Sequence, residues 1–189
     1  MDDAVPAHRI TGFFRDAFEH TAWRLETRRA YAADQGTEEY RRFLAGVAPP
    51  RDDGPWFVNA RRQTASGKRM ERVRLVDEPA THNQRYLLAT TPDNLAAGED
   101  IRFLFRSRAQ EIGLPDFDFW LFDSSVLATF DWDDAARRLE LTTDPHRVPA
   151  ACRARDAAWH YAARYEEFRA RVPSMPTAPP GRRPHDPRT

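Results

Sequence analysis

The sequence of 189 residues contains a single cysteine, Cys152, and a single lysine, Lys68. One cysteine excludes a disulfide within the chain, and one lysine means that arginine supplies almost all of the positive charge. The 29 basic and 29 acidic residues leave no formal net charge. A net charge of zero removes the general electrostatic attraction to nucleic acids and anionic membranes, so direct nucleic-acid binding is disfavoured.

Long apolar runs are also missing. No stretch approaches the ~20 apolar residues that span a bilayer, and the acidic N-terminus lacks the apolar core of a signal peptide. These absences predict a cytoplasmic protein without membrane contact. Hydrophobic residues make up 41% of the chain, which is enough for one sizeable core. We expect a flexible N-terminus over residues 1–9, one domain over 10–172, and a disordered Pro/Arg-rich tail over 173–189.

Alternation of apolar and polar residues favours strands at several places. The strongest case is the aromatic-rich stretch 98–132, where three successive strand patterns predict a meander at the centre of a sheet. In its middle segment, alternation predicts that Phe117 and Phe119 face the core. Asp116 and Asp118 would then lie on the opposite face.

Helix signals flank the predicted strands. Capping and stop residues predict helices over about 37–45 and 56–66, while 82–95 is ambiguous between a short helix and a strand. Apolar residues spaced three and four apart from Ala154 to Val172, after Pro149, predict one long C-terminal helix. The predicted fold is a single α+β domain, with a mostly antiparallel sheet, helices packed against it and that long C-terminal helix.

Arginines alternate with apolar residues in one predicted strand. Arg72 and Arg74 share a face of this strand, and Arg24 joins them if its own strand is adjacent. Glu78 and Arg85 follow closely in the sequence. An exposed row of guanidinium groups of this kind binds carboxylate or phosphate. The alternative is a solvated sheet face on which arginines pair with glutamates, each pair contributing little to stability.

A second candidate site lies at the end of a short helix that the sequence predicts from about Thr11 to His20. Glu19 and His20 precede a strand that carries Arg24, and a helix end that faces a sheet can hold a general base beside an arginine clamp for an anion. The alternative is that His20 caps the helix C-terminus while Glu19 pairs with a nearby arginine.

Motifs for other chemistries are missing. Asp116 and Asp118 form a D-x-D pair of the kind that can hold a divalent metal. However, no EF-hand loop, HExxH motif or Cys–His spacing supplies further ligands. Cys152 has no recognisable catalytic partner, and there is no G-x-S-x-G motif or phosphate-binding glycine loop. We therefore predict neither a metal nor a cofactor.

Four phrases carry a family resemblance, in this order: FEHTAWRLETR, KRMERVRLVDEP, AGEDIRFL and LPDFDFWLFD. They resemble a family of actinobacterial proteins, the domain of unknown function 6879, over about residues 12–170. Many such proteins are encoded beside, or fused to, helix-turn-helix regulators. The resemblance therefore implies a regulatory or sensing role, with such a regulator as an expected protein partner.

A second resemblance is to degenerate phospholipase D-like domains. Their signature has a histidine, any residue, a lysine, four residues and an aspartate, followed by a strand. Asp116, Asp118 and Asp123 occupy these three positions here. The nucleophilic histidine and the lysine are therefore absent, which implies that phosphodiester chemistry is lost.

Together these patterns favour a non-catalytic regulatory or sensing module. We expect it to bind a small anionic ligand or a partner protein through the Arg/Glu-bearing sheet face. The alternative is an enzyme or enzyme subunit in which Glu19 and His20 act as acid and base beside an arginine clamp. An enclosed pocket in which His20 and arginines converge would favour the enzyme.

Overall fold

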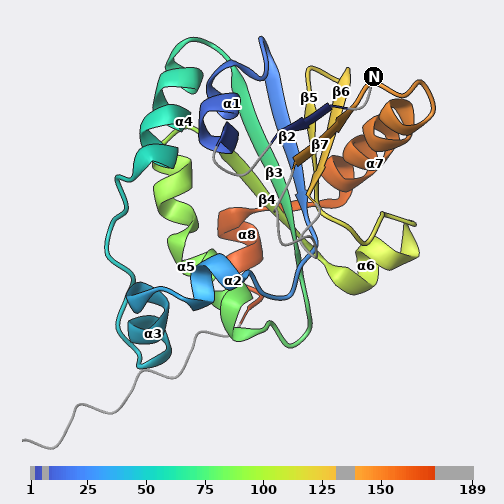
Figure 1. Cartoon of the computed structure of the whole chain (residues 1–189). Coiled ribbons are helices and arrows are strands. Elements are labelled where there is room, and N and C mark those ends of the chain that lie inside the picture. The colour runs from blue at the N-terminus through green and yellow to red at the C-terminus, as the bar shows by residue number, and fades with distance from the viewer. Residues whose placement is uncertain (1–2, 6–8, 131–138, 173–189) are drawn as a thin grey trace, which may run out of the picture.

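The computed structural model describes residues 3–5, 9–130 and 139–172, and its centre is one eight-stranded sheet (Figure 1). The strands lie in the order β1-β7-β6-β5-β2-β3-β4-β8. Their bounds are β1 Asp3–Val5, β2 Thr21–Glu26, β3 Arg69–Val76, β4 Asp100–Phe105, β5 Phe119–Phe122, β6 Val126–Phe130, β7 Leu139–Thr142 and β8 Ala163–Arg164. The helices are α1 Ile10–Asp16, α2 Ala32–Gln35, α3 Glu38–Leu44, α4 Pro55–Ala65, α5 His82–Ala96, α6 Arg106–Glu111, α7 Arg147–Tyr161 and α8 Tyr165–Arg169.

The sheet is mixed, which corrects the predicted mostly antiparallel arrangement. β2, β3 and β4 run parallel, and the remaining neighbours are antiparallel. The parallel pairs follow from their long connections, since α2, α3 and α4 lie between β2 and β3, and α5 lies between β3 and β4. A connection that contains a helix can return the chain to the starting end of the sheet, so the next strand runs in the same direction.

The predicted three-strand meander is correct only in its second half. β5, β6 and β7 are antiparallel neighbours, but β3 and β2 separate β4 from β5. The missed helix α6 and the loop after it carry the chain from β4 to its place beside β2. Alternation alone cannot show which strands become neighbours.

The predicted long C-terminal helix is interrupted. α7 ends at Tyr161, and Ala162 is extended, with ψ of 135°. Ala163 and Arg164 then pair with β4 as the edge strand β8, and α8 begins at Tyr165. Hydrogen bonding to the open edge of β4 competes with continuation of the helix, and helical periodicity does not report that tertiary contact.

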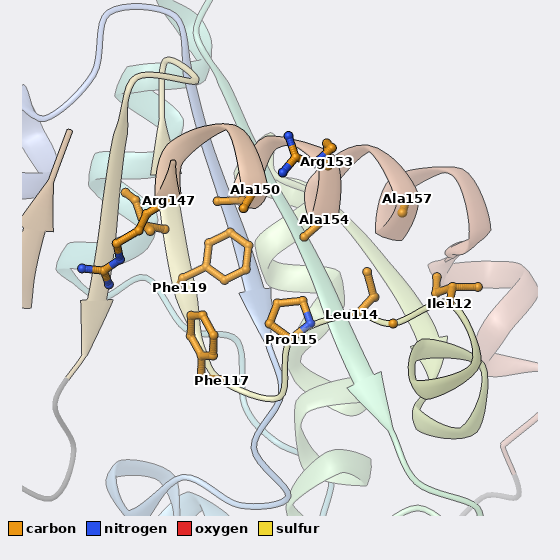
Figure 2. A pocket seen from close by; sticks show the side chains of 13 residues that line it. Ile112, Leu114, Pro115, Phe117, Phe119, Arg147, Ala150, Arg153, Ala154 and Ala157 are labelled. Carbon is orange, nitrogen blue, oxygen red and sulfur yellow. The ribbon is translucent and has the colours of Figure 1, made fainter. Parts of the chain in front are cut away.

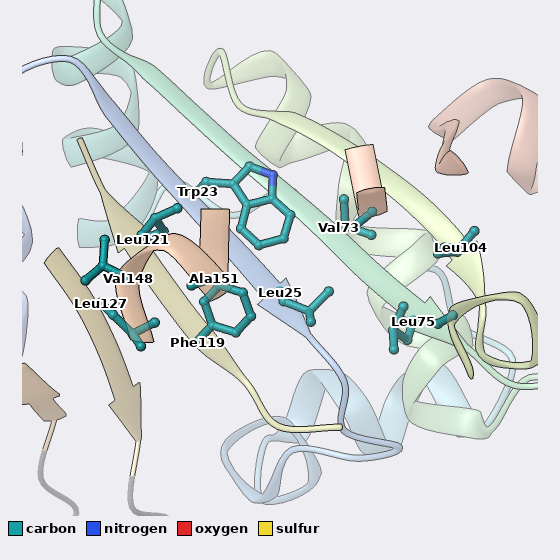
Figure 3. Close-up of a cluster of buried hydrophobic side chains, with 12 residues drawn as sticks. Trp23, Leu25, Val73, Leu75, Leu104, Phe119, Leu121, Leu127, Val148 and Ala151 are labelled. Atoms are coloured by element: carbon teal, nitrogen blue, oxygen red, sulfur yellow. The ribbon is translucent and has the colours of Figure 1, made fainter. Parts of the chain in front are cut away.

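Helices cover both faces of the sheet, with α1, α4, α5 and α8 on one side and α6 and α7 on the other (Figure 1). On the α7 side, Trp23, Leu25 and Phe119 belong to a buried cluster with residues of α7 (Figure 3). On the α4 side, Trp120 and Phe122 pack with residues of α1 and α4. Both faces of the central strands are therefore buried.

The two-sided core changes the predicted orientation of residues 116–119. Phe119 is 1% exposed, as expected, but Phe117 is 49% exposed and Asp118 is buried. The reason is that β5 begins only at Phe119, so the strand alternation does not extend back to Phe117.

Residues 82–95, ambiguous on the sequence, belong to the 15-residue helix α5 despite Pro92 within it. A capping box formed by Thr81 and Gln84 holds its first turn.

The chain then turns through Gly98, whose φ is +89°, and a Cβ at this position would lie 2.5 Å from Thr64 Oγ1. Glycine suits both the backbone angle and the close approach, and the turn brings Glu99 to the start of β4.

Residues 3–5 of the segment expected to be flexible form β1, which pairs with β7. The predicted tail, 173–189, lies outside the described residues. Among the helices of the described ranges, none combines the length and apolar character needed to cross a bilayer.

Candidate functional site

Parallel pairing of β2 and β3 brings four charged side chains together on the α4 side of the sheet. The register places Arg24 beside Arg72 and Glu26 beside Arg74. Alternate residues of a strand share a face, so all four point to the same side. Three of the predicted anion-binding arginines are therefore assembled around one carboxylate.

Glu26 is the centre of this group. Its Oε1 accepts a hydrogen bond from Arg72 Nη1 at 3.1 Å and lies 3.1 Å from Arg24 Nη1, while Oε2 accepts from Arg74 Nε at 2.5 Å. Burial opposes ionisation of Glu26, but the charges of the three arginines, Arg74 first, outweigh it. They hold the pKa of this carboxyl well below its usual range, so Glu26 is ionised at neutral pH.

Asp118, immediately before β5, binds the other side of Arg24. Its Oδ2 accepts from Arg24 Nη2 at 3.1 Å and from the Tyr31 hydroxyl at 2.8 Å. Its Oδ1 accepts from the backbone N–H of Thr27 at 2.7 Å and from the Thr27 hydroxyl at 3.0 Å. Burial raises the pKa of Tyr31, and the charges of Glu26 and Asp118 contribute in the same direction, so the phenol stays protonated and acts as a donor.

Glu99 completes the group on the side of α4. Its Oε2 lies 2.7 Å from Arg72 Nη2, and its Oε1 accepts from Trp56 Nε1 and Asn94 Nδ2, both at 2.7 Å. The Arg72 guanidinium also lies over the Trp56 ring, 4.7 Å from its centroid. Arg72 is thus fixed by two carboxylates and by a cation–π contact.

We call six residues the buried charge cluster: Arg24, Glu26, Arg72, Arg74, Glu99 and Asp118. Three arginines and three carboxylates give it no net charge. Each carboxylate oxygen has a hydrogen-bond donor or a guanidinium nitrogen as a neighbour. By contrast, three buried atoms of the cluster form no hydrogen bond among the described residues: Nε of Arg24, Nε of Arg72 and Oε2 of Glu99, although this oxygen lies 2.7 Å from Arg72 Nη2. The charges of the cluster are therefore paired, while two donors and one acceptor are left without a hydrogen bond.

A cavity of about 620 Å³, which we call the cluster pocket, opens above this cluster. Its floor contains Arg24, Glu26, Arg72 and Arg74, and its walls come from α2, α3, α5 and the loop before α4. The wall residues include Ala33, Asp34, Glu39, Arg51, Asp52 and Tyr86. A cavity of this size holds a small organic molecule.

The predicted exposed row of arginines is wrong in one respect. Arg72 and Arg74 are only 6% and 5% exposed, because helices cover this face and Glu26 compensates their charge. The alternative prediction is a solvated sheet face with arginine–glutamate pairs. The pairs are present, but they are buried. The arginines therefore form a network of ion pairs at the bottom of a pocket and not the predicted surface patch.

Two other predicted binding residues lie away from the pocket. Glu78 is exposed in the segment between β3 and α5. Arg85 lines a different cavity, together with Phe43 of α3 and Tyr165 of α8. Neither contributes to the cluster pocket.

Glu19 and His20 lie at the opposite end of β2 from Glu26. Both are exposed, and their backbone N–H groups donate to the Asp123 carboxylate at 2.7 and 2.8 Å. The N–H of Thr21 donates to the same carboxylate at 2.7 Å. Neither Glu19 nor His20 lines the cluster pocket, so the structure does not bring this pair together with the arginines.

Glu26, Glu99 and Tyr31 are not predicted from the sequence as residues of the binding site. Glu26 has a weak signal, because an acid alternates with arginine in a strand that neighbours another arginine-bearing strand. Glu99 and Tyr31 follow a turn and a loop, and only tertiary contacts bring them to the site. Among the described residues, no group of three or more His, Cys, Asp or Glu is placed to hold a metal ion.

A second cavity, of about 580 Å³, lies on the other side of the sheet, between α7 and residues 112–119 (Figure 2). The small side chains of Ala150 and Ala154 lie across it from Leu114 and Phe119. Its lining residues are mostly apolar, and the charged ones among them are two exposed arginines. The cluster pocket, with buried charges on its floor, is the candidate binding site.

The family model of a domain of unknown function (DUF6879) matches residues 8–170. The chain belongs to this family. The match confirms the resemblance carried by the four sequence phrases, and all six residues of the buried charge cluster lie within the DUF6879 region. A comparison with curated proteins gives no match.

Solved structures are similar to this DUF6879 chain at low sequence identity. Nuc from Salmonella typhimurium, a phospholipase D family member, has 11% identity and a TM-score of 0.52, covering 87% of this chain and 96% of Nuc. NucT from Helicobacter pylori has 8% identity and a TM-score of 0.47, covering 87% and 98%. The archaeal chromatin protein TrmBL2 has 10% identity and a TM-score of 0.45, covering 86% and 54%. The similarity to Nuc shows a common fold.

The three aspartates that match the spacing of the phospholipase D signature have different surroundings. Asp116 is exposed, and Asp118 is bound to Arg24 and Tyr31 in the buried charge cluster. Asp123 accepts three backbone N–H groups at the start of β2. Two of the three side chains therefore hold neighbouring segments together.

Proposed function

We propose that this domain is a non-catalytic binding module with a regulatory or sensing role. Its site is the cluster pocket, and its ligand is a small molecule that presents carboxylate or phosphate oxygens to the arginine floor. The observation that carries the proposal is that Arg24, Arg72 and Arg74, held by buried carboxylates, line the bottom of a cavity of about 620 Å³.

The energetics of the floor support this function. Bringing charged groups out of water costs several kcal/mol per ion, and well-packed apolar residues often give equal or greater stability. A purely structural sheet face would therefore gain little from three buried arginines. Guanidinium groups held rigidly by carboxylates are pre-organised donors for a planar carboxylate or a phosphate.

A non-catalytic role agrees with the residues near the pocket. Aspartates replace the histidine and lysine of the phospholipase D signature, and Asp118 is engaged by four hydrogen bonds. Glu19 and His20, the alternative acid and base, lie outside the pocket. We further propose that the domain acts in the cytoplasm with a helix-turn-helix regulator as its partner. The partner is implied by the family resemblance, and the location follows from the absence of long apolar runs in the sequence.

The test blocks the pocket without changing the buried charge cluster. Ala33 is exposed in α2 and lines the pocket, so Ala33→Trp fills the cavity from its rim. Ala32 is also exposed in the same helix but does not line the pocket, so Ala32→Trp is the matched control.

Thermal melts are recorded with inorganic phosphate, phosphoethanolamine, carboxylates of four to eight carbons and the corresponding amino acids. We expect at least one compound to raise the melting temperature of the wild type and of Ala32→Trp but not of Ala33→Trp, because a ligand stabilises only the form that binds it. Equal stabilisation of both tryptophan variants would contradict the assignment of this pocket.

A further inference from the structure

The mouth of the cluster pocket carries a different charge pattern from its floor. The charged wall residues that are exposed or half-buried are Asp34, Glu39, Arg51 and Asp52. Three carboxylates and one arginine leave two net negative charges, whereas the cluster below has no net charge. Among their hydrogen bonds, Asp34 accepts from Asn83 Nδ2 at 3.1 Å, and Asp52 Oδ1 accepts from the backbone N–H of Gly54 at 2.7 Å.

Three of these residues, Asp34, Glu39 and Asp52, influence Tyr86 in the wall of the pocket. Burial raises the pKa of Tyr86, and the charges of Asp34, Glu39 and Asp52 raise it further, although a hydrogen bond with Thr37 opposes them. Asp34, Glu39, Asp52 and Tyr86 also line the same cavity, so a ligand group near the Tyr86 ring lies within the field of these carboxylates. Carboxylates gathered around an aromatic side chain form a favourable environment for an ammonium group.

We propose that the ligand of the cluster pocket is zwitterionic. Its carboxylate or phosphate contacts the arginine floor, and its ammonium group lies among Asp34, Glu39 and Asp52 at the mouth. This inference rests on the proposed function and makes its ligand class more specific.

A ligand with a charge of only one sign interacts favourably with either the acidic mouth or the arginine floor, but not with both. A simple anion meets two net negative charges at the mouth before it reaches a floor with no net positive charge. A simple cation is attracted to the mouth but offers no acceptor to the guanidinium groups that line the floor. A zwitterion complements both levels without adding net charge.

The test uses probes that differ at one end. The zwitterions are 4-aminobutyrate, 6-aminohexanoate and 8-aminooctanoate, which cover a range of separations between the two charges. Hexanoate, adipate and hexylamine provide the anion, the dianion and the cation at the six-carbon length. Phosphoethanolamine and ethyl phosphate form the corresponding phosphate pair. Affinities are measured by isothermal titration calorimetry.

The mouth variant is Glu39→Gln/Asp52→Asn, which removes two exposed carboxylates and leaves the buried charge cluster intact. Its control is Glu38→Gln/Asp53→Asn, which makes the same change in net charge at the adjacent residues. Glu38 and Asp53 are 65% and 80% exposed and do not line the pocket. Comparison of the two variants separates a local effect from a change in overall charge.

For the wild type, we expect the best zwitterion to bind roughly 2- to 30-fold more tightly than its matched monoanion, the gain that two exposed charge pairs provide. The mouth variant should lose most of this preference, and its control should keep it.

A monoanion or dianion that binds at least as tightly as the best zwitterion would overturn this inference and leave the proposed function in place. Hexylamine binding as tightly as 6-aminohexanoate would overturn both, because the arginine floor would then be unused. Equal loss in the mouth variant and its control would also overturn this inference, and failure of every probe to bind would contradict both.

Discussion

Replacing Glu26 with glutamine removes the negative charge at the centre of the buried charge cluster while keeping the size of the side chain. Three arginines would then share two carboxylates, and the cluster would change from neutral to a net charge of +1. Loss of one partner from a buried ion pair costs about 3–5 kcal/mol, because the remaining charge stays buried without compensation. We expect Glu26→Gln to lower the free energy of unfolding at pH 7 by about this amount, out of a typical ~5–15 kcal/mol.

The pH dependence of this loss identifies its cause. The pKa of Glu26 is lower in the folded protein than in the unfolded chain, where it is about 4.3. The carboxylate therefore contributes its full stability above about pH 4.3, and the contribution decreases as the pH falls below that value. The difference between wild type and Glu26→Gln should be largest at pH 7 and should shrink below about pH 4.

Urea unfolding followed by circular dichroism at pH 7, 5, 4 and 3 measures this difference. Glu140→Gln, at an exposed position of β7, is the control and should change stability by less than ~0.5 kcal/mol. A loss under ~1 kcal/mol for Glu26→Gln, or a loss that is equal at pH 7 and pH 3, would refute the buried ionic network.

Other predictions concern the core, the start of β2 and the floor of the pocket. Phe119→Ala should lower the free energy of unfolding by about 3–5 kcal/mol, because this side chain is 1% exposed; urea melts showing less than ~1 kcal/mol would contradict the packing. Asp123→Ala should cost about 2–3 kcal/mol, because it removes three backbone hydrogen bonds and places alanine at a φ of +48°. Asp123→Asn should cost less, since asparagine tolerates this φ, and equal losses in the two variants would argue against the strain contribution. In folded Glu26→Gln protein, calorimetry should show tighter hexanoate binding than in the wild type, because the floor gains positive charge; unchanged or weaker binding would argue against contact with the floor.

The sequence predicts individual strands better than their arrangement. Alternation reflects local side-chain placement, and the segments around Arg24 and around Arg72 and Arg74 are strands, β2 and β3, as predicted. Their parallel order depends on how α4 and α5 pack against the sheet, and no local pattern encodes that packing. The break between α7 and α8 has the same kind of cause, since it depends on the open edge of β4.

The candidate site shows the same limit at the level of side chains. Arg24, Arg72 and Arg74 are recognisable as one potential group because strand alternation places them on one face. Their burial is not recognisable, because it depends on covering helices and on Glu99 and Asp118, which come from distant parts of the chain. The acidic mouth likewise combines α2, α3 and the loop before α4, and only the folded chain reveals it.

The most direct test of the proposed function is nuclear magnetic resonance of the arginine side chains. Nε–H signals of Arg24, Arg72 and Arg74 are assigned by mutation and followed during separate titrations with inorganic phosphate, hexanoate and 6-aminohexanoate. Arg155, which donates to Ser124 on the α7 side of the sheet, is the internal control. We predict that at least one probe shifts the signals of Arg24 and Arg74, with saturation at a single affinity, while the Arg155 signal stays unchanged. Saturable shifts confined to arginines outside the cluster pocket would contradict the account.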